Sequence, residues 1–217
     1  MKAKKFLPVL MALAVIFSCI GITAFASETS VSGLAGSGTE SDPYLIKDID
    51  DLVFFRDSVN NKETTYNAEN VYVALEEDID MEGVDWSVNI GDDCGTTFDG
   101  VFDGKGHTIS NLTSTEKEQK RDGYVCTGLF GAIYKNAQVK NLTFKNATIN
   151  TGSFTGSNIG IVVGFAYNGT GSIENIKVIG DIKVDAEKTY AVGAIVGYLY
   201  YGDLDIINCS VEANSGS

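Results

Sequence analysis

Apolar residues recur along this chain in short alternating runs separated by Gly, Asn and Asp. This pattern is typical of short strands joined by tight turns. Three runs of Gly and apolar residues end at Gly131, Gly164 and Gly197, so that successive glycines are 33 residues apart. A period of this length predicts a repeat protein whose units stack on one another and bury a shared core.

A second motif reads apolar, any residue, Asn, apolar. Its asparagines are Asn111, Asn141, Asn175 and Asn208, at intervals of 30, 34 and 33 residues. We expect them to stack in register at an inward-facing turn, where each side-chain amide donates to one neighbour and accepts from the other. Such a ladder would satisfy polar groups that are costly to bury unpaired.

Ankyrin and tetratricopeptide units have a similar period, but each needs two helices, which the Gly, Asn and Thr content disfavours. The sequence therefore predicts an all-β fold, a right-handed parallel β-helix (solenoid) of about four rungs over residues 67–217. Residues 38–66 precede it as an entry strand and one amphipathic helix. We expect this helix to run from Asp48, as N-cap, through Asn60 and to cover the first rung.

The first residues resemble an export signal. Three lysines precede an apolar segment from Phe6 to about Thr23, and Ala24-Phe25-Ala26 offers a signal-peptidase site. We therefore expect residues 1–26 to be a signal peptide and residues 27–37 a flexible linker. A retained membrane anchor is the alternative, because the apolar segment approaches the length that spans a bilayer. After cleavage we expect an extracellular or cell-surface protein without membrane insertion.

The net charge limits the classes of partner, and the number of cysteines limits the possible disulfides. The chain has 16 Lys and Arg against 29 Asp and Glu, a net charge of −13, which disfavours nucleic acid and anionic lipid. Cys94, Cys126 and Cys209 lie outside the leader and allow one disulfide at most. Cys94 with Cys126 is the pairing to consider, and the alternative is that none of the three pairs.

Several segments resemble bacterial surface and secreted proteins that carry the GLUG motif, a region also found beside the catalytic part of some IgA-cleaving metallopeptidases. The matching segments are GTESDPYLI at 38–46, VALEEDIDMEG at 73–83, FDGVFDGKGHTISNL at 98–112 and GLFG at 128–131. The resemblance implies a right-handed β-helix in an extracellular setting, usually within a longer polypeptide. We expect a truncated product or a C-terminal edge completed by a continuing β-helix chain.

Residues that could carry chemistry have simpler structural interpretations. The chain has a single histidine, His107, and therefore cannot contain the His-Glu-x-x-His zinc motif, which needs two. Asp99 and Asp103 could form a glycosidase-like carboxylate pair, but the same residues begin two Asp-Gly turns. The acidic segment 78–83 fails as an EF-hand because Asn89 occupies the twelfth position. We therefore expect no cofactor or specific metal site, with incidental Ca²⁺ binding left open.

Tyr134, Tyr167 and Tyr200 each lie three residues after one of the aligned glycines and are expected to form a column along the coil. Such a column can stabilise the stack, or it can form a platform for a host glycan or protein. The sequence thus predicts an exported, non-catalytic module for surface interaction or adhesion, belonging to or truncated from a larger protein. The alternatives are a polysaccharide-active enzyme fragment, lyase or glycosidase-like, and a structural spacer.

Overall fold

The structure, a computed structural model, describes residues 33–92, 95–115 and 125–214. The expected signal peptide lies outside these residues. Side chains 153–156 and 168–169 are also not described. The elements are β1 Tyr44–Ile46, α1 Ile49–Asn60, β2 Tyr72–Leu75, β3 Ile79–Asp80, β4 Val101–Asp103, β5 Thr108–Ser114, β6 Val125–Thr127, β7 Phe130–Tyr134, β8 Gln138–Gly160, β9 Val163–Gly169, β10 Ser172–Gly193, β11 Val196–Gly202, β12 Asp205–Ile207 and β13 Ser210–Asn214.

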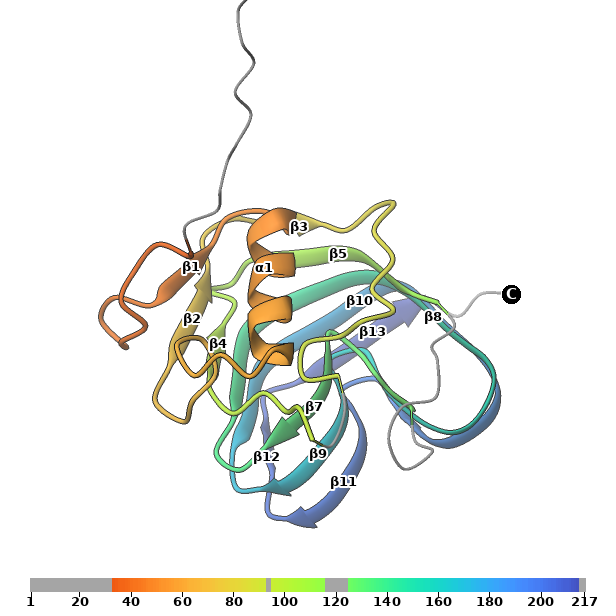
Figure 1. The fold of residues 1–217 in the computed structure, drawn as a ribbon. Coiled ribbons are helices and arrows are strands. Elements are labelled where there is room, and N and C mark those ends of the chain that lie inside the picture. The colour runs from red at the N-terminus through yellow and green to blue at the C-terminus, as the bar shows by residue number, and fades with distance from the viewer. Residues whose placement is uncertain (1–32, 93–94, 116–124, 215–217) are drawn as a thin grey trace, which may run out of the picture. The chain divides into compact units, whose positions relative to one another are not determined.

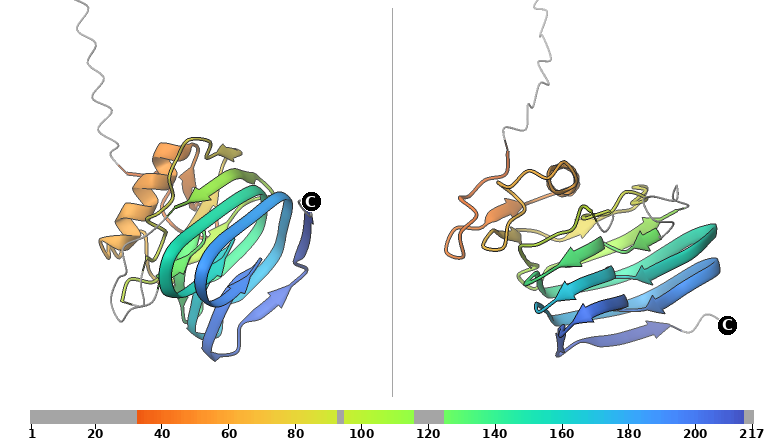
Figure 2. Two further views of the ribbon diagram at one scale, coloured as in Figure 1. Left: turned by 90° about the vertical axis from the view of Figure 1, so that its right-hand side faces the viewer. Right: turned by 60° about the horizontal axis from the view of Figure 1, so that its bottom comes forward.

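The strands stack as a parallel β-solenoid of about five turns (Figure 1 and Figure 2). One sheet runs in the order β1-β2-β4-β8-β10-β12, and β7, β9 and β11 form a second sheet. Ile173 pairs with Val139 on one side and with Ile206 on the other, so each turn lies about one sequence repeat from the next. The predicted all-β solenoid is confirmed. It has one turn more than expected, because the short strands β2 and β3 add a turn that carries neither repeat motif.

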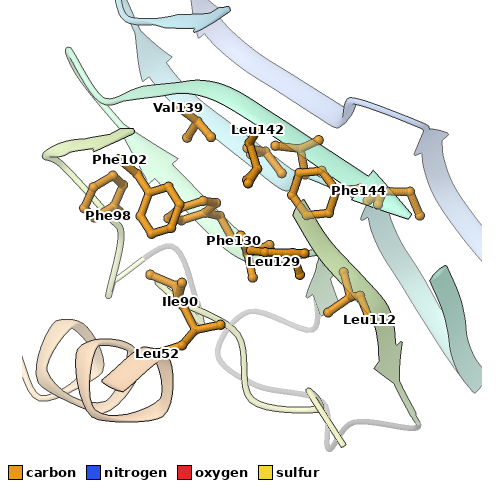
Figure 3. Close-up of a cluster of buried hydrophobic side chains, with 14 of the residues drawn as sticks. Leu52, Ile90, Phe98, Phe102, Leu112, Leu129, Phe130, Val139, Leu142 and Phe144 are labelled. Carbon is orange, nitrogen blue, oxygen red and sulfur yellow. The ribbon is translucent and has the colours of Figure 1, made fainter. Parts of the chain in front are cut away.

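The core is a stack of inward-facing apolar side chains from successive turns (Figure 3). Phe102 of β4, Phe130 of β7 and Phe144 of β8 are completely buried. The rings of Phe102 and Phe130 lie 5.3 Å apart, edge to face, and Phe98 lies 5.1 Å from Phe130. Aromatic pairs in this geometry add stability beyond the area that they bury.

Helix α1 closes the N-terminal end of this core. The side chain of Asp48 accepts a hydrogen bond from the backbone N–H of Asp51 and caps the helix as predicted. Leu52, Phe55 and Val59 follow helical spacing and are completely buried. The Phe55 ring lies 5.8 Å from that of Phe98, so the helix packs directly on the first turns. No helix in the described part of the chain has the length and apolar character needed to cross a membrane.

Replacing Phe102 with alanine is expected to lower the free energy of unfolding by about 3–5 kcal/mol, because it opens a cavity between α1 and the core. Chemical denaturation monitored by circular dichroism measures the change. Tyr190→Ala is the matched control, since this ring is 60% exposed and its loss should cost less than about 1 kcal/mol. Equal losses in the two variants would contradict the assigned core.

Candidate functional site

Asn141, Asn175 and Asn208 stack at one corner of the solenoid. The Asn175 Nδ2 donates to Asn141 Oδ1 at 2.9 Å, and the Asn208 Nδ2 donates to Asn175 Oδ1 at 3.3 Å. The row begins at Asp103, whose Oδ1 accepts from the Asn141 Nδ2 at 2.9 Å. We call these four residues the first ladder. Each amide donates toward the N-terminal end, and Asn141 and Asn175 also accept from the C-terminal side.

Asn111 belongs to a different row, although the sequence motif grouped it with the other three asparagines. Its Nδ2 donates to Asp80 Oδ1 at 2.8 Å, and its Oδ1 accepts from the Asn146 Nδ2 at 3.3 Å. The Asn146 Oδ1 accepts from the backbone N–H of Asp181, and Asp181 Oδ1 accepts from the Asn214 Nδ2 at 3.0 Å. We call Asp80, Asn111, Asn146, Asp181 and Asn214 the second ladder.

The ladder asparagines lie on the outer side of the corners, whereas the sequence suggested an inward-facing turn. Asn175 and Asn208 are exposed, and Asn111 and Asn141 are half-buried. Their φ angles, with that of Asn146, lie between +53° and +58°. This left-handed conformation is costly for most residues and is tolerated by Gly and Asn, so backbone geometry as well as hydrogen bonding selects asparagine here.

The aspartates that begin the ladders are held in their charged form. Hydrogen bonds, the largest from Asn111, hold the pKa of Asp80 below its ordinary value. Partial burial by itself would raise the pKa of Asp103, but the hydrogen bonds from Asn141 and from the Lys105 backbone N–H outweigh it, and this pKa is also lowered. A carboxylate can only accept, so each ladder starts with an acceptor and its direction is fixed.

The remaining acidic candidates form hydrogen bonds with neighbouring parts of the chain. Burial raises the pKa of Asp99, whose Oδ1 accepts from the Thr97 hydroxyl at 2.8 Å. The imidazole of His107 lies 3.1 Å from Asp78 Oδ1, which also accepts from the Thr108 backbone N–H. Asp99 and Asp103 therefore belong to separate hydrogen-bond networks. Among the described residues, no group of three or more His, Cys, Asp or Glu side chains is placed to hold a metal ion.

A polar hollow of about 380 Å³ lies over β3 and β5. Within it, the carboxylates of Asp78 and Asp80 already accept hydrogen bonds from the chain itself. Both bonds help to fix the turns of the solenoid, and the hollow has no repeated feature like that of the surface described next. Its lining residues are Asp78, Ile79, Asp80, Thr108, Ser110, Asn111, Lys145 and Asn146.

The strands β7, β9 and β11 lie side by side in one sheet (Figure 1). This sheet carries the three predicted tyrosines, one on each strand. Tyr134 pairs in register with Tyr167, and Tyr167 pairs with Tyr200. The ring centroids are 5.5 Å and 5.8 Å apart, with interplanar angles of 16° and 12°. We call these residues the tyrosine column. Parallel rings at these separations overlap only partly, and each of the three tyrosines remains partly exposed.

Further aromatic side chains widen this surface. Phe165 and Tyr198 lie two residues before Tyr167 and Tyr200, and their rings are 5.8 Å apart. The ring of Tyr201, which is 70% exposed, packs against Tyr200. Sequence reasoning missed Tyr190, whose ring lies 5.2 Å from that of Tyr198, because it comes from β10 and no motif links it to the column. The tyrosine column with Phe165, Tyr190, Tyr198 and Tyr201 forms the aromatic face.

The aromatic face combines rigid and accessible parts. Phe165 is 8% exposed, whereas Tyr167 and Tyr200 are 36% and 41% exposed. A hydrogen bond with Tyr201 raises the pKa of the Tyr200 hydroxyl above its ordinary value. The Lys135 ammonium lies 5.2 Å from the Tyr134 ring centroid. The face thus offers apolar rings with polar edges, held in fixed positions by the stacked strands.

The structure describes two of the three cysteines that lie outside the leader, Cys126 and Cys209. Cys94 lies outside the described residues, and with it the considered Cys94–Cys126 pairing. Cys126 is buried beside Phe165 and Ala132 in a small cluster separate from the main core. The Cys209 Sγ lies 3.4 Å from the carbonyl oxygen of Ile173.

Comparisons with known proteins reveal two similarities. No family model matches the chain. Over 133 residues, 60% of its length, the chain is 35% identical to part of halomucin from Haloquadratum walsbyi, and it spans about 1% of that protein. A crystal structure of a proposed immunoglobulin A1 protease from Bacteroides ovatus aligns with 82% of this chain and 69% of its own, at 19% identity and a TM-score of 0.39.

Substitutions at Asn175 separate its two structural roles. Asn175→Ala is expected to lower the free energy of unfolding by about 2–3 kcal/mol, because it loses two hydrogen bonds and alanine tolerates the left-handed conformation less well than asparagine does. Asn175→Gly loses the same hydrogen bonds without the backbone strain and should cost about 1 kcal/mol. Urea denaturation measures both. Equal costs would show that the positive φ is not what selects asparagine.

The first ladder should also depend on pH. The pKa of Asp103 is lower in the folded chain than in the unfolded chain, where it has the ordinary value of about 3.9. Its carboxylate therefore stabilises the fold at pH values above about 3.9, and this contribution is lost as the pH falls through the folded-state pKa. Asp103→Asn keeps a side-chain acceptor without this titration. Its urea midpoint should therefore fall less than that of the unmodified chain between pH 5 and pH 3. Identical falls would contradict a role for the Asp103 charge.

Proposed function

We propose that this chain is a non-catalytic surface or secreted module that binds a neutral polysaccharide along its aromatic face. The observation that carries the proposal is the tyrosine column, a set of identical, partly exposed rings repeated at 5.5 Å and 5.8 Å. A regular row of identical groups suits a linear polymer, because each unit of the polymer can meet the same kind of contact.

An exported location is supported by the sequence and by one relative. The leader has the basic start, apolar segment and small-residue site of a signal peptide. The similarity to part of halomucin, and the resemblance of the quoted segments to GLUG-motif surface proteins, are in keeping with an exported repeat protein. The solenoid also suits a surface role, since stacked turns present one extended, rigid face to a partner.

A binding role without catalysis is supported by the state of the acidic side chains. A glycosidase needs one carboxyl to act as an acid and a second carboxylate across the same bond. Asp99 is held to Thr97, whereas Asp103 accepts from Asn141 and anchors the first ladder. Both carboxyls are thus engaged in separate structural contacts.

A neutral glycan is favoured as the partner by charge and by ring chemistry. The net charge of −13 repels anionic polymers. The C–H groups of a sugar pack on the uncovered part of a tyrosine ring, and its hydroxyls can hydrogen-bond to the ring's polar edge. A protein partner remains an outcome of the test and not the proposal, because the near-equal spacing of three identical rings suits a polymer of repeated units.

Sedimentation with insoluble cellulose and chitin tests the proposal, with anionic polygalacturonate as the comparison. The unmodified chain should be depleted by a neutral polysaccharide and not by the anionic one. The triple variant Tyr134→Ala, Tyr167→Ala, Tyr200→Ala should bind at least roughly tenfold more weakly, a change of about 1.4 kcal/mol. The three Tyr→Phe replacements keep the rings and should retain most of the binding.

Tyr72→Ala is the matched control, because Tyr72 is a half-buried tyrosine on β2, outside the aromatic face. Circular dichroism should confirm that every variant remains folded, since loss of the column's stacking costs about 1–3 kcal/mol. Unchanged binding in the triple alanine variant, or no depletion by either neutral polysaccharide, would reject the proposed surface. Release of reducing sugar would reject the non-catalytic role.

A further inference from the structure

The last turn of the solenoid, β12 with β13, lies at the end of the stack of strands (Figure 2). Ile206 is 52% exposed and Val211 is 47% exposed, whereas their register partners one turn earlier, Ile173 and Val178, are both completely buried. These positions face the same core, and they differ in whether another turn lies over them. The described residues provide no strand beyond β12 and β13.

Both ladders end at this turn with an open acceptor. Asn208 and Asn214 use their side-chain Nδ2 atoms to donate to Asn175 and Asp181. Because each ladder donates toward the N-terminal end, the amide oxygens of Asn208 and Asn214 face the uncovered side without a hydrogen bond from the described residues. The group that would continue each ladder is therefore a donor, such as the Nδ2 of another asparagine.

We propose that this edge is a docking site for one further parallel solenoid turn, the first turn of another solenoid segment of the same repeat type. Its strands run parallel to β12 and β13, and its corner asparagine donates to Asn208 Oδ1. The interface repeats the one that already joins β10 to β12 and β13 within the chain. The apolar positions at Ile206 and Val211 then become core.

A second copy of this chain does not meet those requirements. Helix α1 covers its N-terminal turn, where Ile46 and Leu52 are completely buried, so a head-to-tail copy presents a helix and not an open strand edge. A tail-to-tail copy places one set of amide oxygens against another. It also brings together the carboxylates of Asp203 and Asp205, while the sequence after Lys188 contains no basic residue. The docking turn is therefore expected to be neutral or basic at this edge.

The experiment adds the missing turn to the full chain. A second copy of residues 182–214 replaces residues 215–217, because Asn214 pairs with Asp181 and residue 182 is the next position in register. Within the copy, Asp203→Asn, Asp205→Asn and Glu212→Gln keep the added turn from placing carboxylates on those of the original edge. The thermal midpoint should rise by at least about 4 °C, the scale on which a domain of this size responds to one modest added interface. Binding of a dye specific for exposed apolar surface should not increase, because the copy covers as much edge as it creates.

The matched control carries the Asn208→Asp change only within the added copy. This variant keeps the strands and the apolar side chains but cannot donate to the original Asn208, so it should lose at least half of the rise in midpoint. No rise in the extended chain, or equal rises in the two extended chains, would overturn the proposal. Sedimentation showing that the unextended chain dimerises through this edge, and that the extension abolishes the dimer, would assign the edge to a second copy.

This test is independent of the proposed polysaccharide binding. The tyrosine column is complete in the unextended chain, so its binding assay does not require the edge to be occupied. Failure of the extension would leave the assay on the aromatic face unaffected. Failure of polysaccharide binding would likewise not affect the change in thermal midpoint, which would still test the proposed edge.

Discussion

Parallel stacking of successive turns is the constraint on which the other features of this structure depend. A turn hydrogen-bonds to the turn before and the turn after it, at the fixed separation of paired strands. Side chains at equivalent positions are therefore forced into contact with one another. Completely buried apolar residues meet in the core, asparagines meet at the corners, and Tyr134, Tyr167 and Tyr200 meet on the outer face. The rings of the aromatic face are held in fixed positions because the paired strands that carry them are fixed.

The sequence predicted the features that repeat without a change in spacing. The interval of 33 residues placed Tyr167 and Tyr200 correctly, because no residue is inserted between β9 and β11 relative to the turn before. Asn111 could not be placed in this way. Ser110 pairs with Lys145 and Leu112 with Ala147, so Asn111 lies against Asn146, and the matching letters around Asn141 belong to another corner. A corner that differs in length between turns changes the register without changing the motif.

The residues that begin the two ladders could not be found from the asparagine motif, because they are aspartates. Asp103 and Asp80 occupy the places where a search for repeated asparagine finds none, yet a carboxylate accepts a hydrogen bond as an amide oxygen does. Tyr190 was missed for a different reason, since its contact with Tyr198 joins two strands that no shared motif relates. The contact between them can be found from coordinates and not from periodicity, because periodicity relates equivalent positions alone.

The position of α1 gives the chain a direction of assembly. During synthesis the capping helix and the first turns leave the ribosome before the later strands exist, and folding of stacked repeats can nucleate in one region and spread to its neighbours. Phe55 and Phe102 can therefore enclose a nucleus early. Each strand that follows finds a finished template with its acceptors already oriented. A nascent chain of this kind would lengthen by accretion, so a defect in an early turn should be more damaging than the same defect in a late one.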